Sequence, residues 1–141
     1  MHIILGADHA GLSLKNEIKQ YLLQGHEVID VGADSLDLND DFSSFVLKMR
    51  EQFDGDNNAR IIAVCGSGVG MNIGLNKHVG IRCVLGHNVD EVALAREHNN
   101  VNALAISGKT LPSDAMAMID AFLATSSLGG KYDKRMKDIE L

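Results

Sequence analysis

The 141-residue sequence is long enough for one compact domain and too short for a two-domain enzyme. Apolar residues make up 45% and charged residues 23%, which is typical of globular proteins and argues against intrinsic disorder. The formal charge of −6 and the 4% of aromatic residues give neither the basic surface nor the stacking side chains of nucleic-acid-binding proteins. No apolar stretch approaches the roughly 20 residues that cross a bilayer, so we expect a cytoplasmic protein with no membrane partner.

Five short apolar segments alternate with helical patterns along the chain. The predicted strands are residues 2–5, 27–31, 61–65, 81–85 and 103–106. Helical spacing follows over 12–23, 42–53, 90–98 and 113–122, with Ser113 as the expected N-cap of the last of these helices. A glycine-rich turn at 66–70 leads into a further short helix, and two glycines at 129–130 open a polar tail.

This alternation predicts a parallel sheet with right-handed crossovers, in a single three-layer, Rossmann-like α/β domain over 1–141. We expect five strands in the flavodoxin-like order 2-1-3-4-5, in which the first and third strands are neighbours. Ligands of open α/β sheets bind at the carboxyl ends of strands where the winding direction reverses. The loop with Asp8 and His9 and the loop over 65–70 should therefore face one another.

Cys65 ends a buried strand and directly precedes the glycine-rich loop. Amides that point toward a helix N-terminus stabilise a thiolate, although a small buried hydrophobe is an equally open interpretation. Cys83 lies inside a strand with no glycine loop after it, and we expect it to be buried. The two cysteines are 18 positions apart in the sequence, which indicates neither a disulfide nor a redox pair.

The loop over 66–70 does not match the common phosphate-binding motifs. Met71 stands where a dinucleotide fingerprint needs its third glycine and where a cysteine phosphatase needs arginine. The lysine and Ser/Thr of a P-loop are also missing. Its three glycines leave backbone amides free to approach an oxyanion, and a purely structural turn remains the alternative.

Two histidine positions are candidates for proton transfer. Asp8 and His9 follow the first strand, where a carboxylate beside an imidazole can move protons or bind phosphate; capping of the next helix is the alternative. His98 ends a helix, a position at which the dipole alone favours a protonated ring. The remaining histidines share no metal-ligand spacing with each other or with the cysteines, so we expect no metal site.

Five segments resemble one family in their order and spacing. GADHAG, CGSGVGMNIGLNK, GIR, REHNN and GGKYDKR are similar to the family that contains ribose-5-phosphate isomerase B and the galactose-6-phosphate isomerase subunits. The resemblance covers nearly the whole chain. It implies a cofactor-free aldose–ketose isomerase of a small phosphorylated sugar, active as a homodimer or homotetramer with shared sites, whose tail over 127–141 packs on a partner subunit.

The resemblance also implies roles for individual residues. Cys65 falls at the position of the catalytic base, and His98 falls at that of an acid that opens the sugar ring together with Asp8. Isomerisation carries a proton between C1 and C2 through an enediolate, whose oxygen Ser67 and the loop amides can hold. The positions that match substrate-binding residues are His9, Gly66, Gly68, Val69, Gly70, Asn99, Lys109, Lys131 and Arg135. For the basic tail, a phosphate clamp and a solvated segment both remain open.

Several positions depart from the commoner ribose-5-phosphate isomerase pattern. Phe42 and Ser43 replace the Tyr-Pro of an Asp-Tyr-Pro segment, and Tyr132 stands where histidine is frequent. Lys109 and Lys131 replace arginines, exchanging a bidentate fork for a point charge. Ribose 5-phosphate is the expected substrate. A galactose, allose or tetrose phosphate and a non-catalytic sugar-phosphate-binding subunit are the alternatives.

Overall fold

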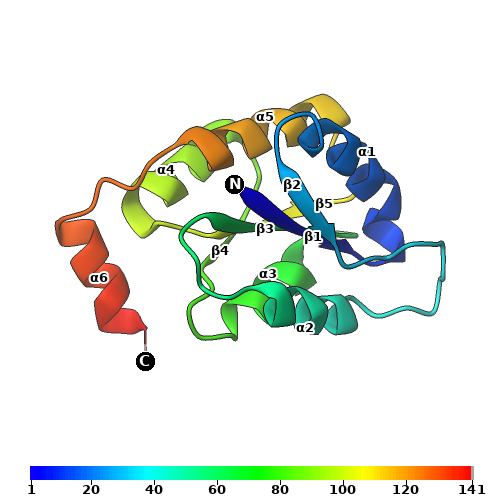
Figure 1. Ribbon diagram of the computed structural model, residues 1–141, viewed down its shortest axis with the longest axis horizontal. Coiled ribbons are helices and arrows are strands. Elements are labelled where there is room, and N and C mark those ends of the chain that lie inside the picture. Colours follow the sequence, from blue (N-terminus) through cyan, green and yellow to red (C-terminus); the bar gives the residue numbers. More distant parts are fainter. Residues whose placement is uncertain (141) are drawn as a thin grey trace.

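The computed structural model describes residues 1–140, which form a five-stranded parallel sheet covered by helices on both faces (Figure 1). The predicted three-layer α/β architecture is confirmed. The strands are β1 (His2–Ala7), β2 (Glu27–Asp30), β3 (Ala59–Cys65), β4 (Cys83–Leu85) and β5 (Ala103–Ser107). The helices are η1 (His9–Gly11), α1 (Leu12–Leu22), α2 (Phe42–Gln52), α3 (Val69–Asn76), α4 (Val89–Asn99), α5 (Pro112–Ala124) and α6 (Lys131–Ile139).

Two apolar cores lie on the two faces of the sheet. Helices α1, α4 and α5 cover one core, and α2 and α3 cover the other. Alternate residues of β3 enter opposite cores, as the pleat of a strand requires: Ile62 and Val64 join the first, whereas Ile61 and Cys65 join the second. The Cys65 side chain therefore lies on the α2–α3 side of the sheet.

The predicted strand order is wrong for the last two strands. The observed order is β2-β1-β3-β5-β4, so β5 pairs with β3 and β4 becomes an edge strand. Burial accounts for this exchange: all three residues of β4 are half-buried, whereas four of the five in β5 are fully buried, as in a central strand. The reversal of winding still falls between β1 and β3, where the sequence predicted the ligand-binding end.

The carboxyl-terminal part of the chain contains more helix than the sequence indicates. Helix α5 begins at Pro112, with Leu111 at the N-cap position in place of the predicted Ser113. Proline suits this first helical position because its fixed φ is already helical. The predicted polar tail contains α6, which lies beyond the end of α4 and far from the start of α1 (Figure 1). The tail prediction also covers Leu141, which lies outside the described residues.

A buried charge pair fixes the loop after β2. The Lys15 side chain is 1% exposed, and its Nζ lies 2.9 and 2.8 Å from the two carboxylate oxygens of Asp30 and 2.7 Å from the Ala33 carbonyl oxygen. Burial works to raise the pKa of Asp30, but bonds from Lys15, the Gly32 amide and Lys19 outweigh it and lower the pKa. The loop is thereby tied to α1.

Within residues 1–140, no helix has both the length and the apolar composition needed to cross a membrane.

Candidate active site

The carboxyl ends of β1 and β3 bring Asp8 and Cys65 side by side. Ala7 pairs with Val64 in the parallel ladder, and the next residues along the chain are Asp8, which follows β1, and Cys65, which ends β3. Both residues are mostly enclosed, with Asp8 8% and Cys65 5% exposed. Asp8 Oδ1 accepts a hydrogen bond of 3.1 Å from the Gly11 amide, so this carboxylate also caps η1. The register therefore places the two predicted neighbours at the same end of adjacent strands.

The loops after β1, β3 and β5 close tightly around this point. The Gly108 amide donates to the Cys65 carbonyl at 2.7 Å, and Ser107 Oγ donates to the Gly66 carbonyl at 2.8 Å. A Cβ at Gly108 would overlap the carbonyl oxygen of Ala10, so glycine is needed where the first and last of these loops touch. Lys109 is exposed at the same edge, and its amide donates to Ser107 Oγ at 3.2 Å.

The glycine-rich loop turns directly into α3. Gly68 has a φ of +80° and occupies the N-cap position of the helix. Ser67 Oγ accepts a 3.2 Å bond from the Val69 amide, and the Ser67 side chain is exposed beside it. The first amides of a helix have no acceptor within the helix. The loop thus presents backbone donors and one hydroxyl next to Cys65.

Phe42 forms a side wall of the glycine-rich loop. A Cβ built on Gly70 would lie only 2.9 Å from Phe42 Cζ, so the ring stands directly over this glycine. Phe42 is 39% exposed at the start of α2. The segment that replaces Asp-Tyr-Pro therefore lies alongside the predicted site, with an apolar ring in place of a phenol.

Asp40 contacts the predicted residue His9 but was absent from the sequence-based prediction. Its Oδ1 lies 2.6 Å from His9 Nδ1 and accepts a 3.0 Å bond from the His9 amide. The hydrogen bond to Asp40 raises the pKa of His9; burial opposes this, while the charges of Asp40, Asp8 and Asp37 add to it. Asp40 is 31 positions from His9, and no spacing or motif links the two residues in the sequence.

Two groups of side chains bring potential metal ligands together, although spacing in the sequence indicated none. Donor atoms of Asp8, His9 and Asp40 lie within 4.8 Å of one another, as do those of a second group, His2, Asp54 and Asp56. In the first group, the contact between His9 Nδ1 and Asp40 is a hydrogen bond that already engages one donor from each residue.

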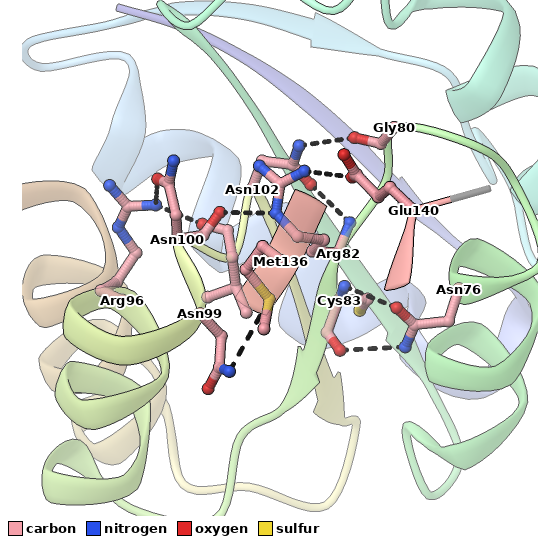
Figure 2. Close-up of polar contacts among 11 residues, drawn as sticks. Asn76, Gly80, Arg82, Cys83, Arg96, Asn99, Asn100, Asn102, Met136 and Glu140 are labelled. Atoms are coloured by element: carbon pink, nitrogen blue, oxygen red, sulfur yellow. Dashed lines mark hydrogen bonds and ion pairs between the residues drawn. The ribbon is translucent and has the colours of Figure 1, made fainter. Parts of the chain in front are cut away.

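The predicted residues His98 and Asn99 lie at the opposite end of the strands, where the strands begin. They end α4, just before Asn102, whose carbonyl accepts from the Ile61 amide and whose side chain accepts from the Arg82 amide. Ile61 lies near the amino-terminal end of β3, and Arg82, which Figure 2 labels beside Asn102, directly precedes β4. Within one chain, His98 and Cys65 therefore lie at opposite ends of the strands of the sheet.

Helix α6 packs against this end of α4. The rings of His98 and Tyr132 stack, and Asn99 Nδ2 lies 3.8 Å from the sulfur of Met136. The guanidinium of Arg82 pairs with Glu140 near the end of α6 (Figure 2). Lys131 and Arg135 place their cationic groups 5.2 and 5.5 Å from the Tyr132 ring centroid. The basic tail residues are thus gathered beside His98 and Asn99.

The predicted site residues fall into two sets in the folded chain. The loop group, at the carboxyl ends of the strands, consists of Asp8, His9, Cys65, Gly66, Ser67, Gly68, Val69, Gly70 and Lys109. The helix group, at the amino ends of the strands, consists of His98, Asn99, Lys131 and Arg135.

Cys83 lies outside both groups, in the edge strand β4. Burial raises the pKa of its thiol to about 12, only partly offset by a hydrogen bond with the backbone of Ala105. Cys83 therefore remains a neutral thiol at neutral pH, as expected for a structural cysteine.

Comparison with known proteins agrees with both the fold and the residue pattern. The sequence profile of the Ribose/Galactose Isomerase family matches residues 3–139. The chain belongs to this family. Ribose-5-phosphate isomerase B of Mycobacterium leprae is 39% identical over 141 residues, which cover 99% of this chain and 87% of the relative. The resemblance found in the sequence is thereby confirmed.

Solved structures of family members have the same fold. The ribose 5-phosphate isomerase of Thermotoga maritima superimposes with a TM-score of 0.93 at 35% identity, covering 99% of this chain and 97% of that one. Ribose-5-phosphate isomerase B of Mycoplasma genitalium, solved with bound ribulose 5-phosphate, gives a TM-score of 0.92 at 31% identity, with coverage of 98% and 93%.

Proposed function

We propose that this protein is an aldose–ketose isomerase that interconverts ribose 5-phosphate and ribulose 5-phosphate. The observation that carries the proposal is the register of β1 and β3, which sets Cys65 beside Asp8 under a loop of backbone donors. Its family membership and the ribulose 5-phosphate bound in the Mycoplasma genitalium relative support the same reaction.

Cys65 is the base in this proposal. As a thiolate it removes the proton from C2 of the open-chain aldose to give a cis-enediolate; the hydroxyl proton on O2 passes to O1, and the thiol returns its proton to C1, so that the ketone forms at C2 and the thiolate is restored. The amides of 66–70 and the Ser67 hydroxyl donate hydrogen bonds to the enediolate oxygen, whose negative charge develops during the reaction. Because Cys65 is 5% exposed, bulk water has little access to the proton it carries.

The helix group supplies the remaining functions from a second copy of the chain. His98 acts as the acid that opens the sugar ring, together with Asp8 of the first copy. Lys131 and Arg135 bind the phosphate, and fixing this remote end holds C1 and C2 at the base. A two-fold symmetric homodimer in which each helix group faces the partner's loop group forms two complete sites. A homotetramer can be assembled from such dimers, and the segment from 127 onward then packs on a partner subunit.

A substrate panel tests the reaction. Phosphorylated tetroses, pentoses and hexoses are supplied to the wild type, to Cys65→Ala and to Cys83→Ala, and ketose formation is followed. We expect turnover of ribose 5-phosphate, retained in Cys83→Ala and reduced by about a thousandfold or more in Cys65→Ala. Unchanged turnover in Cys65→Ala contradicts the assignment of the base, and binding without turnover of any sugar indicates a non-catalytic subunit.

Subunit complementation tests the shared site. Cys65→Ala and His98→Ala are each inactive alone in this proposal. Mixed after dissociation, half of the re-formed dimers contain one copy of each variant, and one of the two sites in each mixed dimer has both groups intact, so about a quarter of wild-type activity returns. If each chain has a complete site, mixing returns no activity.

A hexose phosphate is the second candidate substrate. Phe42 favours it. This ring lies over Gly70 and lacks the phenol hydroxyl that the tyrosine of the commoner pattern offers to the sugar. Faster turnover of galactose or allose 6-phosphate than of ribose 5-phosphate in the same panel selects this alternative.

A further inference from the structure

Asp40 holds His9 by both its backbone and its ring. Oδ1 of Asp40 accepts from the His9 amide at 3.0 Å and lies 2.6 Å from Nδ1 of the same residue. Two contacts to a single carboxylate oxygen fix the position of the main chain and the orientation of the imidazole together. With Nδ1 engaged, Nε2 is the ring atom left for a ligand.

The loop that carries Asp40 is itself held in place at both ends. At its start, the Ala33 amide donates to the Ala7 carbonyl at 2.6 Å, and Lys15 Nζ donates to the Ala33 carbonyl at 2.7 Å. Near its end, the Asp40 amide closes a turn on the Asp37 carbonyl at 3.1 Å, one residue before the N-cap of α2. The carboxylate therefore approaches His9 from a supported segment.

The burial of Asp40 favours a charged partner. Its side chain is 11% exposed, and its second oxygen, Oδ2, is buried without a hydrogen-bond partner within residues 1–140. A buried carboxylate that keeps its charge needs compensation, and a protonated His9 ring provides it through a charge-assisted hydrogen bond. The pKa of His9 is accordingly raised, with Asp40, Asp8 and Asp37 as the acidic groups that act on it.

We propose that Asp40 is a positioning residue that orients His9 with Nδ1–H toward the carboxylate and presents Nε2–H as a donor to an anionic oxygen of the substrate. This inference rests on the proposed function, because it names the residue that prepares His9 for a phosphorylated sugar. In this proposal the Asp40 side chain acts through its contacts with His9 and does not bind the substrate itself.

Three substitutions distinguish the effect of the Asp40 charge from that of its hydrogen bond and from the general effect of a nearby acidic residue. Asp40→Asn keeps an oxygen acceptor at the same place and removes the charge, whereas Asp40→Ala removes both. Asp37→Asn is the matched control, since Asp37 lies in the same loop and acts on His9 only through its charge. The Asp37 side chain accepts from the Asn39 amide, and asparagine preserves that bond.

Nitrogen NMR of His9 gives a readout that does not depend on activity. In the wild type we expect Nδ1 protonated and a titration midpoint above 6.5. The midpoint falls in Asp40→Asn and falls much less in Asp37→Asn, because the hydrogen bond to Asp40 is the largest cause of the raised pKa and the charge of Asp37 is the smallest. The preference for Nδ1–H is lost in Asp40→Ala. Titration and tautomer that are the same in all four proteins overturn the proposal.

Kinetics with ribose 5-phosphate give the second readout. We expect KM to rise about tenfold in Asp40→Ala and severalfold in Asp40→Asn, with kcat within about twofold of the wild type. In the wild type, KM rises as the pH passes upward through the His9 pKa, and this rise moves to lower pH in Asp40→Asn. If kcat and thermal stability both fall while KM is unchanged, Asp40 has only a structural role, and the proposal is overturned. A wild type that isomerises no sugar refutes the proposed function instead, and the NMR titration still decides whether Asp40 orients His9.

Discussion

The imidazole of His98 stacks on the ring of Tyr132, with centroids 4.5 Å apart and planes 5° from parallel. This contact joins the last turn of α4 to the first turn of α6. The same tyrosine ring lies below the cationic groups of Lys131 and Arg135. One aromatic side chain thus couples the proposed acid to the proposed phosphate ligands.

Removing the Tyr132 ring should therefore impair both functions of the helix group. For Tyr132→Ala we expect KM for the sugar phosphate to rise and kcat to fall, each by about three- to tenfold, because the stacking and cation–π contacts are each worth about 1 kcal/mol. Steady-state kinetics measure both changes. Tyr132→Phe keeps the stack and should stay within about twofold of the wild type; an equal loss in both variants would assign the effect to the hydroxyl.

Gly68 should tolerate no side chain, whereas Gly66 should accept one. A Cβ at Gly68 would lie 2.7 Å from Leu85 Cδ1 and 3.0 Å from the Ile106 carbonyl carbon, at a φ of +80°. Its counterpart at Gly66 meets only the Ala10 Cβ, at 3.6 Å. We expect Gly68→Ala to lower the free energy of unfolding by about 3 kcal/mol and Gly66→Ala to change it by less than about 1 kcal/mol. Urea denaturation measures both, and similar losses would refute the role assigned to the backbone of Gly68.

The sequence predicts that the loop with Asp8 and His9 lies beside the loop over 65–70 because local patterns determine it. The apolar run that ends in Cys65 and the run over 2–5, shortly before Asp8, identify two buried parallel strands, and the winding rule sets their carboxyl ends together. Local patterns do not determine the order of β4 and β5, because apolar periodicity indicates how deeply a strand is buried and not which strand it pairs with. The half-buried pattern of β4 becomes decisive only once the sheet is assembled.

Asp40 and α6 show two further limits of the sequence. The bond between Asp40 and His9 depends on the path of a loop 31 residues away, which no propensity encodes. Helix α6 has no fully buried residue, and its partly buried Tyr132 and Met136 contact His98 and Asn99 at the end of α4. A short helix with so little apolar surface is stabilised by its tertiary contacts rather than by its own sequence. The sequence of α6 therefore cannot be distinguished from that of a polar tail.

Lys15 should be worth far more to stability than Lys19, although both pair with Asp30. Lys15 is 1% exposed and Lys19 is 36% exposed. Lys15→Met leaves a buried carboxylate poorly compensated, and we expect a loss of about 3 kcal/mol in the free energy of unfolding at pH 7. Lys19→Met should cost about 0.5 kcal/mol. Chemical denaturation distinguishes the two, and equal effects would contradict the buried pair.

The same pair predicts the response to acid. The pKa of Asp30 is lowered in the folded protein, so its contribution to stability is complete above the unfolded value of about 3.9 and is lost as the pH falls through the folded value. We expect the stability difference between the wild type and Asp30→Asn to shrink as the pH is lowered from about 5 to 2. Denaturation at a series of pH values measures it, and a difference independent of pH would exclude this linkage.

Phe42 offers the most direct test of which sugar the site prefers. Its Cζ atom is the ring atom that a Cβ on Gly70 would meet most closely, so a hydroxyl added there extends from the wall of the loop group. If the apolar ring disfavours a pentose, Phe42→Tyr should lower KM for ribose 5-phosphate by about three- to tenfold, the value of one hydrogen bond, without a comparable gain for hexose phosphates. Phe42→Leu, which removes the ring without adding a donor, should give no such gain. Because Phe42 is 39% exposed, the tyrosine hydroxyl remains solvated in the free enzyme, and we expect the melting temperature to stay within a few degrees of the wild type. A ratio of kcat/KM between pentose and hexose that is the same in all three proteins would show that position 42 plays no part in selecting the substrate.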